Sequence, residues 1–144
     1  MIEPPEFILV EDSDEDADTV QQAALRCSTP VRLCRVLTGD ACLALLQQTR
    51  PELPALVLMD LNTPGMDGRE TLRLIKSDPR LATIPVVIVS TSANPRDLDY
   101  CYRAGANAYH LKPVRHSEHL QAMVEVLAYW LDRVVAHPNR RVLP

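Results

Sequence analysis

The chain has 144 residues, of which 47% are hydrophobic and 24% charged, and its formal net charge is −4. This length suits one compact domain and is short for two, and the composition is that of a globular protein rather than a disordered or fibrous one. The acidic balance argues against direct nucleic-acid binding, and the sequence contains neither a membrane span nor a signal peptide, so we expect a cytoplasmic protein.

Strand-like and helix-like patterns alternate along the chain. The first half reads as a strand over 7–10, a helix over about 14–26, a strand over 31–37, a helix over 41–48 and a strand over 55–59. The second half reads as a helix over 69–76, a strand over 85–90, a helix over 94–103, a strand over 108–111 and a long final helix. The apolar stripe of the final helix extends from Leu120 to Val134, and His137-Pro138 ends that helix.

Local signals support these boundaries. Ser13 and Asp16 have the spacing of a capping box at the start of the first helix. Pro79 ends the third helix, and Gly105 can adopt the left-handed conformation that ends the fourth.

Five alternating strands and helices predict an α/β fold with a parallel sheet covered on both faces. Right-handed crossovers favour a flavodoxin-like, doubly wound (βα)5 arrangement with strand order 2-1-3-4-5. We expect one domain over 1–144, with its core at about 7–135 and a short C-terminal tail over 136–144.

The cysteines and histidines do not form a recognisable metal site. Their spacing lacks a C-x-x-C motif, and no cysteine or carboxylate completes a tetrahedral set around the close histidine pair His116 and His119. We therefore expect four buried free thiols and four surface histidines.

Polar residues of reactive types follow four of the five predicted strands. Glu11 and Asp12 follow the first strand and Asp60 the third, Ser90 and Thr91 stand at the end of the fourth, and Lys112 follows the fifth. Each alone has an ordinary interpretation as a cap, a turn or a solvated side chain. In a doubly wound sheet they share the carboxyl edge, where ligands bind.

The carboxylates Glu11, Asp12 and Asp60 are hard oxygen donors, which suit magnesium or calcium and are poor ligands for zinc or copper. The absence of a calcium-binding loop favours Mg²⁺, with Mn²⁺ as a further occupant, and a phosphoryl group would complete the site. Asp60 is the candidate nucleophile for that group, Lys112 supplies positive charge, and the main-chain carbonyl of Asn62 is placed to join the metal ligands. The Ser90 hydroxyl can bond a phosphoryl oxygen.

Four segments resemble the receiver domain of two-component response regulators in residue type, order and spacing. They are Glu11-Asp12, the run from Asp60 to Gly68, Ser90-Thr91-Ser92 and the run from Tyr109 to Pro113. The resemblance covers about 7–135. It implies phosphorelay from a sensor histidine kinase onto Asp60, a metal ion at Glu11, Asp12 and Asn62, and contact of Lys112 and Thr91 with the phosphoryl group. It also implies that Ser90 moves toward the acyl phosphate and Tyr109 swings inward, which alters the face formed by the fourth helix, fifth strand and fifth helix.

The resemblance has finer features. The runs 64–70, 75–79 and 84–92 look most like regulators that partner phytochrome-type kinases, so the kinase is expected to be a bacteriophytochrome. The Lys112-Pro113 bond resembles the family's cis peptide. Thr63 replaces a frequent methionine, and Thr91 is bulkier than the usual alanine or glycine.

Two other classes share parts of this pattern. Haloacid-dehalogenase-like phosphatases combine an aspartate nucleophile with magnesium, but they place a general acid two residues later, where this chain has Asn62. A flavin or nucleotide module needs a glycine-rich phosphate cradle, and the loop after the first strand is acidic instead. We therefore expect a phosphorelay receiver that catalyses only its own phosphorylation and dephosphorylation.

We expect a regulator without an output domain, whose signal passes by protein contact. Tyr100, Tyr102, Tyr129 and Trp130 concentrate in the last two helices. We hypothesise a homodimer through that face.

Overall fold

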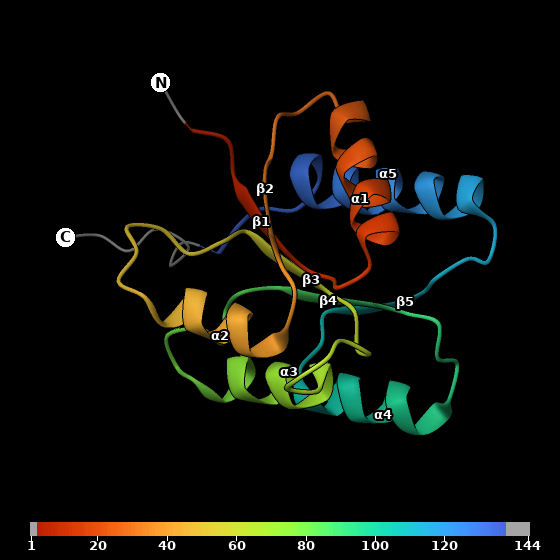
Figure 1. The fold of residues 1–144 in the computed structure, drawn as a ribbon. Helices are drawn as coiled ribbons and strands as arrows, with labels where there is room; N and C mark the ends of the chain where they lie inside the picture. The colour runs from red at the N-terminus through yellow and green to blue at the C-terminus, as the bar shows by residue number, and fades with distance from the viewer. Residues whose placement is uncertain (1–2, 138–144) are drawn as a thin grey trace.

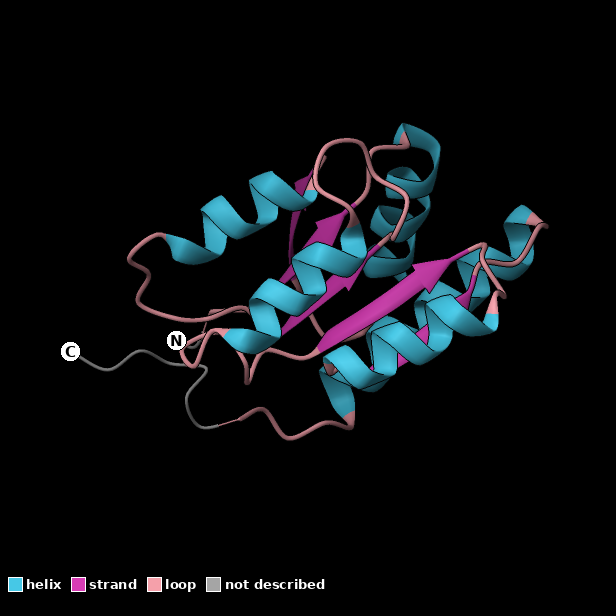
Figure 2. Cartoon of the chain, turned by 90° about the horizontal axis from the view of Figure 1, so that it is seen from below, coloured by secondary structure: helices cyan, strands magenta, loops and turns pink. Residues whose placement is uncertain are grey.

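A five-stranded parallel sheet forms the centre of the protein, with strand order β2-β1-β3-β4-β5 (Figures 1 and 2). The structure, a computed structural model, describes residues 3–137. Its strands are β1 (Glu6–Val10), β2 (Arg32–Val36), β3 (Leu56–Met59), β4 (Val86–Ser90) and β5 (Ala108–Leu111). The predicted fold class and strand order are confirmed.

Five helices cover the two faces of the sheet. They are α1 (Asp14–Arg26), α2 (Gly39–Gln47), α3 (Gly68–Ser77), α4 (Pro95–Ala104) and α5 (His116–Asp132). Helices α1 and α5 pack side by side on one face, whereas α2, α3 and α4 form a row on the other (Figure 1). This is the two-sided covering that buried, continuously apolar strands require.

Alternate residues of each central strand enter two separate hydrophobic cores. In β1, Phe7 and Leu9 pack with α1 and α5, whereas Ile8 and Val10 pack with α2 and α3. Strand β3 repeats the alternation, and the side chains of all four of its residues are buried. Burial on both faces explains why these strands read as unbroken apolar runs.

The predicted helix signals operate at both ends of the helices. The Ser13 hydroxyl accepts a hydrogen bond from the Asp16 amide at 3.2 Å, which caps α1. Gly105 ends α4 with φ 108°, in the left-handed region that favours glycine.

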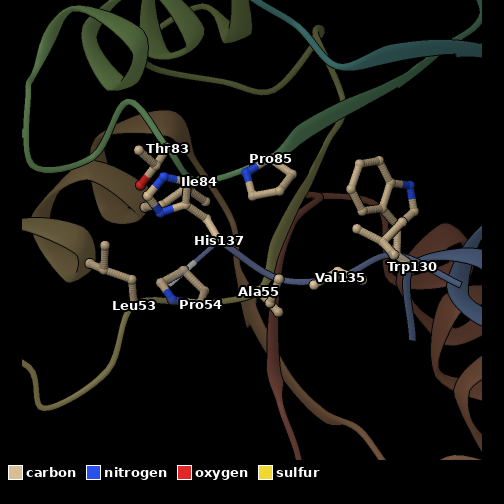
Figure 3. A pocket seen from close by; sticks show the side chains of 11 residues that line it. Leu53, Pro54, Ala55, Thr83, Ile84, Pro85, Trp130, Val135 and His137 are labelled. Atoms are coloured by element: carbon tan, nitrogen blue, oxygen red, sulfur yellow. The ribbon is translucent and has the colours of Figure 1, made fainter. Parts of the chain in front are cut away.

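The last helix is shorter than expected. It ends at Asp132, and the amides of Arg133 and Val134 both donate to the Tyr129 carbonyl. Val134 therefore lies beyond the helix, where it lines an apolar pocket. Leu53 and Trp130 line the same pocket (Figure 3). This pocket lies at the amino edge of the sheet. Most of the predicted tail over 136–144 falls outside the described residues.

The cysteine and histidine predictions hold only in part. All four cysteines are free, but only Cys42 and Cys101 are buried. Burial raises the pKa of Cys42 to about 12. Among the histidines, His119 is 95% buried because the apolar face of α5 carries it inward, so its predicted surface position was wrong. Within residues 3–137, no helix is both long and apolar enough to cross a membrane.

Candidate functional site

The register of the sheet brings Glu11 and Asp60 to the same edge. Val10 pairs with Met59, so the residues that follow β1 and β3 are neighbours. The Asp60 amide donates to the Val10 carbonyl at 3.0 Å, and the Glu11 amide donates to the Val36 carbonyl at 3.0 Å. The backbone of both residues is therefore held by the sheet.

Three predicted site carboxylates meet at this edge. One carboxylate oxygen from each of Glu11, Asp12 and Asp60 lies within 4.8 Å of the other two. Glu11 is buried, Asp60 is half-buried and Asp12 is exposed, so the cluster opens to solvent on the Asp12 side. The sequence therefore correctly predicted which acids come together.

Lys112 reaches this cluster from the end of β5. Its Nζ donates to Asp60 Oδ2 at 3.0 Å, to Glu11 Oε1 at 3.0 Å and to Asp16 Oδ2 at 2.7 Å. The lysine side chain is only 9% exposed. Asp16 was not predicted as a site residue, because its capping-box spacing accounted for it fully.

Burial and neighbouring charges shift the pKa values of Glu11 and Lys112. Burial and repulsion from Asp60 raise the pKa of Glu11 to about 7, against the opposing effect of Lys112. Burial alone would lower the pKa of Lys112, but the hydrogen bonds that its ammonium donates to Asp16 and Asp60 outweigh burial and raise that pKa above 10.5. Lys112 is therefore an ammonium at neutral pH, and the surplus of negative charge favours a further cation.

The donor set fits a divalent metal. Carboxylate oxygens without histidine or thiolate are the ligands that magnesium and manganese prefer, and a site open to solvent leaves room for water ligands. Glu11, Asp12 and Asp60 would hold such an ion. The Asn62 amide donates to Asp60 Oδ1 at 3.0 Å, which orients the carboxylate. A metal role for the Asn62 carbonyl stays a prediction.

The expected cis peptide is absent. No peptide bond among residues 3–137 is cis, so the Lys112-Pro113 bond is trans. Trans is the intrinsically favoured form of an X-Pro bond. The lysine is oriented by the sheet instead, since the Lys112 amide donates to the Ser90 carbonyl at 2.8 Å.

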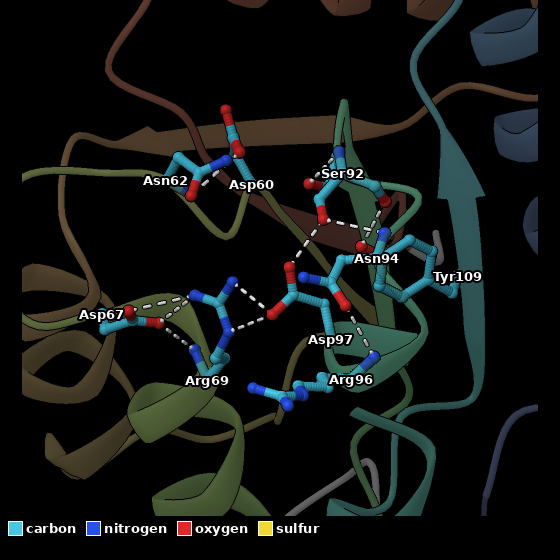
Figure 4. A network of polar contacts seen from close by, with 10 residues as sticks. Asp60, Asn62, Asp67, Arg69, Ser92, Asn94, Arg96, Asp97 and Tyr109 are labelled. Carbon is cyan, nitrogen blue, oxygen red and sulfur yellow. Dashed lines mark hydrogen bonds and ion pairs between the residues drawn. The ribbon is translucent and has the colours of Figure 1, made fainter. Parts of the chain in front are cut away.

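The predicted switch residues Ser90 and Tyr109 both contact Ser92 in the β4–α4 loop. Figure 4 shows the contact between Tyr109 and Ser92. The buried Ser90 hydroxyl accepts from the Ser92 amide at 3.1 Å, and the Tyr109 hydroxyl donates to the Ser92 carbonyl at 2.8 Å. Thr91 is exposed beside them. Ser92 was not singled out as a link from the sequence.

Ser92 also joins this loop to helices α3 and α4 (Figure 4). Its hydroxyl donates to Asp97 Oδ2 at 2.6 Å, and the guanidinium of Arg69 donates to Asp97 Oδ1 at 2.6 and 2.9 Å. These bonds lower the pKa of Asp97 below its usual value, with the Ser92 bond as the larger cause. The loop is thereby held to the first turns of both helices.

His119 is a further residue near the site that sequence reasoning missed. It lines a small pocket with Asp60, Glu11 and Lys112, and neither ring nitrogen has a hydrogen-bond partner among the described residues. Burial lowers its pKa. A histidine on an otherwise apolar helix stripe is the signal that could have placed it inside.

Comparison with known proteins agrees with this geometry. The sequence profile of the response regulator receiver domain matches residues 7–125. Response regulator Rcp1 of Synechocystis sp. is 39% identical over 137 residues, covering 91% of this chain and 92% of the relative. A second relative, from Methanothrix harundinacea, is named 'Probable methanogenesis regulatory protein FilR2'. It is 34% identical over 128 residues, which cover 87% of this chain and 83% of the relative.

Solved structures give the same result. The Mn²⁺-bound form of Rcp1 superposes with a TM-score of 0.88 at 34% identity, covering 93% of this chain and 99% of that one. The phosphorylated cyanobacterial phytochrome response regulator RcpA superposes with the same TM-score at 35% identity and the same coverage. The bacteriophytochrome response regulator RtBRR has a TM-score of 0.72 at 27% identity, covering 96% and 87%.

Proposed function

The chain belongs to the response regulator receiver family, and we propose that it accepts a phosphoryl group on Asp60 from the phosphohistidine of a sensor kinase. The observation that carries the proposal is the contact of the Lys112 ammonium with Asp60 at 3.0 Å, beside the carboxylates of Glu11 and Asp12. A nucleophile, a fixed cation and a set of metal ligands are the parts that phosphoryl transfer to a carboxylate needs.

In the proposed reaction a carboxylate oxygen of Asp60 attacks phosphorus, and the bond from phosphorus to the donor's imidazole nitrogen breaks. The electron pair of that bond stays with the imidazole. Glu11, Asp12, Asp60 and the Asn62 carbonyl would hold Mg²⁺ or Mn²⁺, and the ion would supply neutralising charge for the phosphoryl oxygens. Lys112 supplies a second positive charge, and Ser90 and Thr91 supply hydrogen-bond donors.

The loop after β3 supports the function of a receiver rather than that of a phosphatase. Asn62 is exposed, and its backbone amide donates a hydrogen bond to the Asp60 carboxylate. The side chain of Asn62 cannot act as a general acid. Reaction is therefore limited to the protein's own aspartyl phosphate, which water hydrolyses.

We propose that the protein acts in the cytoplasm and that its kinase is a phytochrome-type histidine kinase. Support comes from the similar structures, since RcpA is named a cyanobacterial phytochrome response regulator and RtBRR a bacteriophytochrome response regulator. We expect the rate of phosphotransfer from such a kinase to be higher than the rate from a histidine kinase of another sensor class.

The function is tested by incubating the protein with acetyl phosphate and Mg²⁺ and measuring the intact mass. One added phosphoryl group is expected, and EDTA should prevent its addition. Sustained release of phosphate from unrelated phosphomonoesters would instead favour a phosphatase.

Metal binding should raise the thermal stability of the protein, because an ion that binds only the folded state shifts the unfolding equilibrium by about 2.7 kcal/mol at a hundredfold excess over its Kd. Titration of Mg²⁺ or Mn²⁺ followed by Tm gives the affinity. Asp12→Asn should weaken that affinity at least about tenfold. Glu15→Gln, a charge change in the neighbouring helical turn, is the control. Equal titrations for the wild type and Asp12→Asn would contradict the assignment of Asp12.

We propose that phosphorylation switches the α4-β5-α5 face through Ser90 and Tyr109. The bonds that both side chains make to Ser92 support this, because a Ser90 hydroxyl that turns to the phosphoryl group would release the Ser92 amide. That amide should then exchange its hydrogen faster in the phosphorylated protein. Hydrogen exchange of peptides over 90–97 measures this, with helix α2 as the internal reference. Unchanged exchange in fully phosphorylated protein would argue against the switch.

We also propose a homodimer through the same face, with signalling by protein contact and no direct nucleic-acid binding. Exposed apolar side chains support an interface there: Tyr100, Tyr102, Leu111 and Tyr129. Sedimentation velocity should show a dimer at micromolar concentration. A monomer both with and without a phosphate mimic would remove the proposal.

A further inference from the structure

The ammonium of Lys112 has an acceptor for each of its three hydrogens. Glu11 and Asp60 accept at 3.0 Å each, and Asp16 accepts at the shorter distance of 2.7 Å. A lysine side chain has three donors and no acceptor, so this set is complete. The shortest of the three bonds goes to the carboxylate that belongs to a helix rather than to a strand end.

Two of these acceptors have a second task in the proposed function. Glu11 and Asp60 belong to the three-carboxylate cluster that would hold the metal, and Asp60 would also take the phosphoryl group. Asp16 lies outside that cluster. It is therefore the one acceptor whose bond to Lys112 need not change when the metal and the phosphoryl group arrive.

Asp16 is held in place independently of Lys112. It lies in the first turn of α1, and its amide donates to the Ser13 hydroxyl at 3.2 Å. The following residues Ala17 and Val20 pack in the core between the sheet and α5. The backbone of Asp16 is thus fixed by α1, and its carboxylate reaches Lys112 from a helix rather than from a strand end.

Resting on the proposed function, we propose that Asp16 is a positioning residue that holds the Lys112 ammonium beside Asp60 throughout phosphoryl transfer. One ammonium hydrogen stays with Asp16, and the other two are free to turn to the phosphoryl oxygens. The pocket beneath Lys112 is lined largely by apolar side chains, among them Leu9, Leu58 and Met123. Without Asp16 the ammonium would lose its fixed acceptor and sample several orientations.

Asp16→Ala tests the proposal, with Glu15→Ala as the matched control. Both substitutions remove one negative charge from the first turn of α1, so they change the long-range field and the interaction with the helix dipole alike. Neither removes the amide that donates to Ser13. Asp16→Ala alone removes the bond to Lys112, and it should slow phosphorylation by acetyl phosphate about tenfold relative to Glu15→Ala.

A second measurement does not depend on phosphorylation. The chain contains only two lysines, Lys76 and Lys112, so protein labelled with side-chain ¹⁵N-lysine gives two ammonium signals. In Asp16→Ala the Lys112 signal should shift and broaden through faster hydrogen exchange. The Lys76 signal is an internal reference because its ammonium donates to the Ala82 and Ile84 carbonyls.

The outcomes separate the two proposals. An unchanged Lys112 signal in Asp16→Ala, or equal phosphorylation rates for Asp16→Ala and Glu15→Ala, would overturn the positioning role. A wild-type protein that takes no phosphoryl group would overturn the proposed function, and the NMR comparison would still decide whether Asp16 holds Lys112.

Discussion

We expect Asp60→Asn to gain no phosphoryl group from acetyl phosphate and magnesium under conditions in which the wild type gains one. Asparagine keeps the shape of the side chain, but its amide is a poor nucleophile and a weaker metal ligand than a carboxylate. The loss should therefore be complete rather than partial. Intact mass measured over a time course gives the result directly.

Asp67→Asn is the matched control for this substitution. Asp67 lies in the same β3–α3 loop and caps α3 by accepting from the Arg69 amide at 2.8 Å, a role that asparagine can keep. This variant should be phosphorylated nearly as well as the wild type. A phosphoryl group on Asp60→Asn would place the acceptor elsewhere in the chain.

Lys112→Ala should have the second largest effect, and it should lower both the stability of the protein and its ability to switch. Without the ammonium, Glu11, Asp16 and Asp60 lose their common partner, and removal of one member of a buried ion pair costs about 3 kcal/mol. The wild-type pKa of Lys112 lies above 10.5, so the ammonium is fully present at neutral pH and its contribution is lost through deprotonation of Lys112 only as pH rises above 10.5. Urea unfolding at neutral pH should reveal the loss.

Magnesium should restore part of the stability of Lys112→Ala, because the ion replaces positive charge among the same carboxylates. The variant should retain some phosphorylation and lose the switch, seen as unchanged hydrogen exchange over 90–97 after phosphorylation. Lys76→Ala is the control, since that lysine bonds main-chain carbonyls away from Asp60. Full switching in Lys112→Ala would show that the switch does not depend on Lys112.

Much of the fold could be predicted from the sequence. Apolar runs such as Leu56–Met59 are buried on both faces, and only a central parallel strand needs that pattern. Turn and cap residues such as Ser13 and Gly105 act locally, so their effects appeared where they were predicted. The end of α5 was misjudged because Val134 continues the apolar stripe but packs from outside the helix.

For the site, the sequence determined the residues at the strand ends, because parallel strands bring their carboxyl ends to one edge whatever the loops do. Only the tertiary structure decided which side chains meet across that edge. Asp16 and Lys112 lie 96 residues apart in the chain, and Ser92 and Tyr109 lie 17 apart. Such contacts depend on sheet register, side-chain length and helix placement, none of which has a local pattern in the sequence. For the same reason the sequence predicts Asp60 as a site residue, whereas the contact of Asp16 with Lys112 is seen only in the tertiary structure.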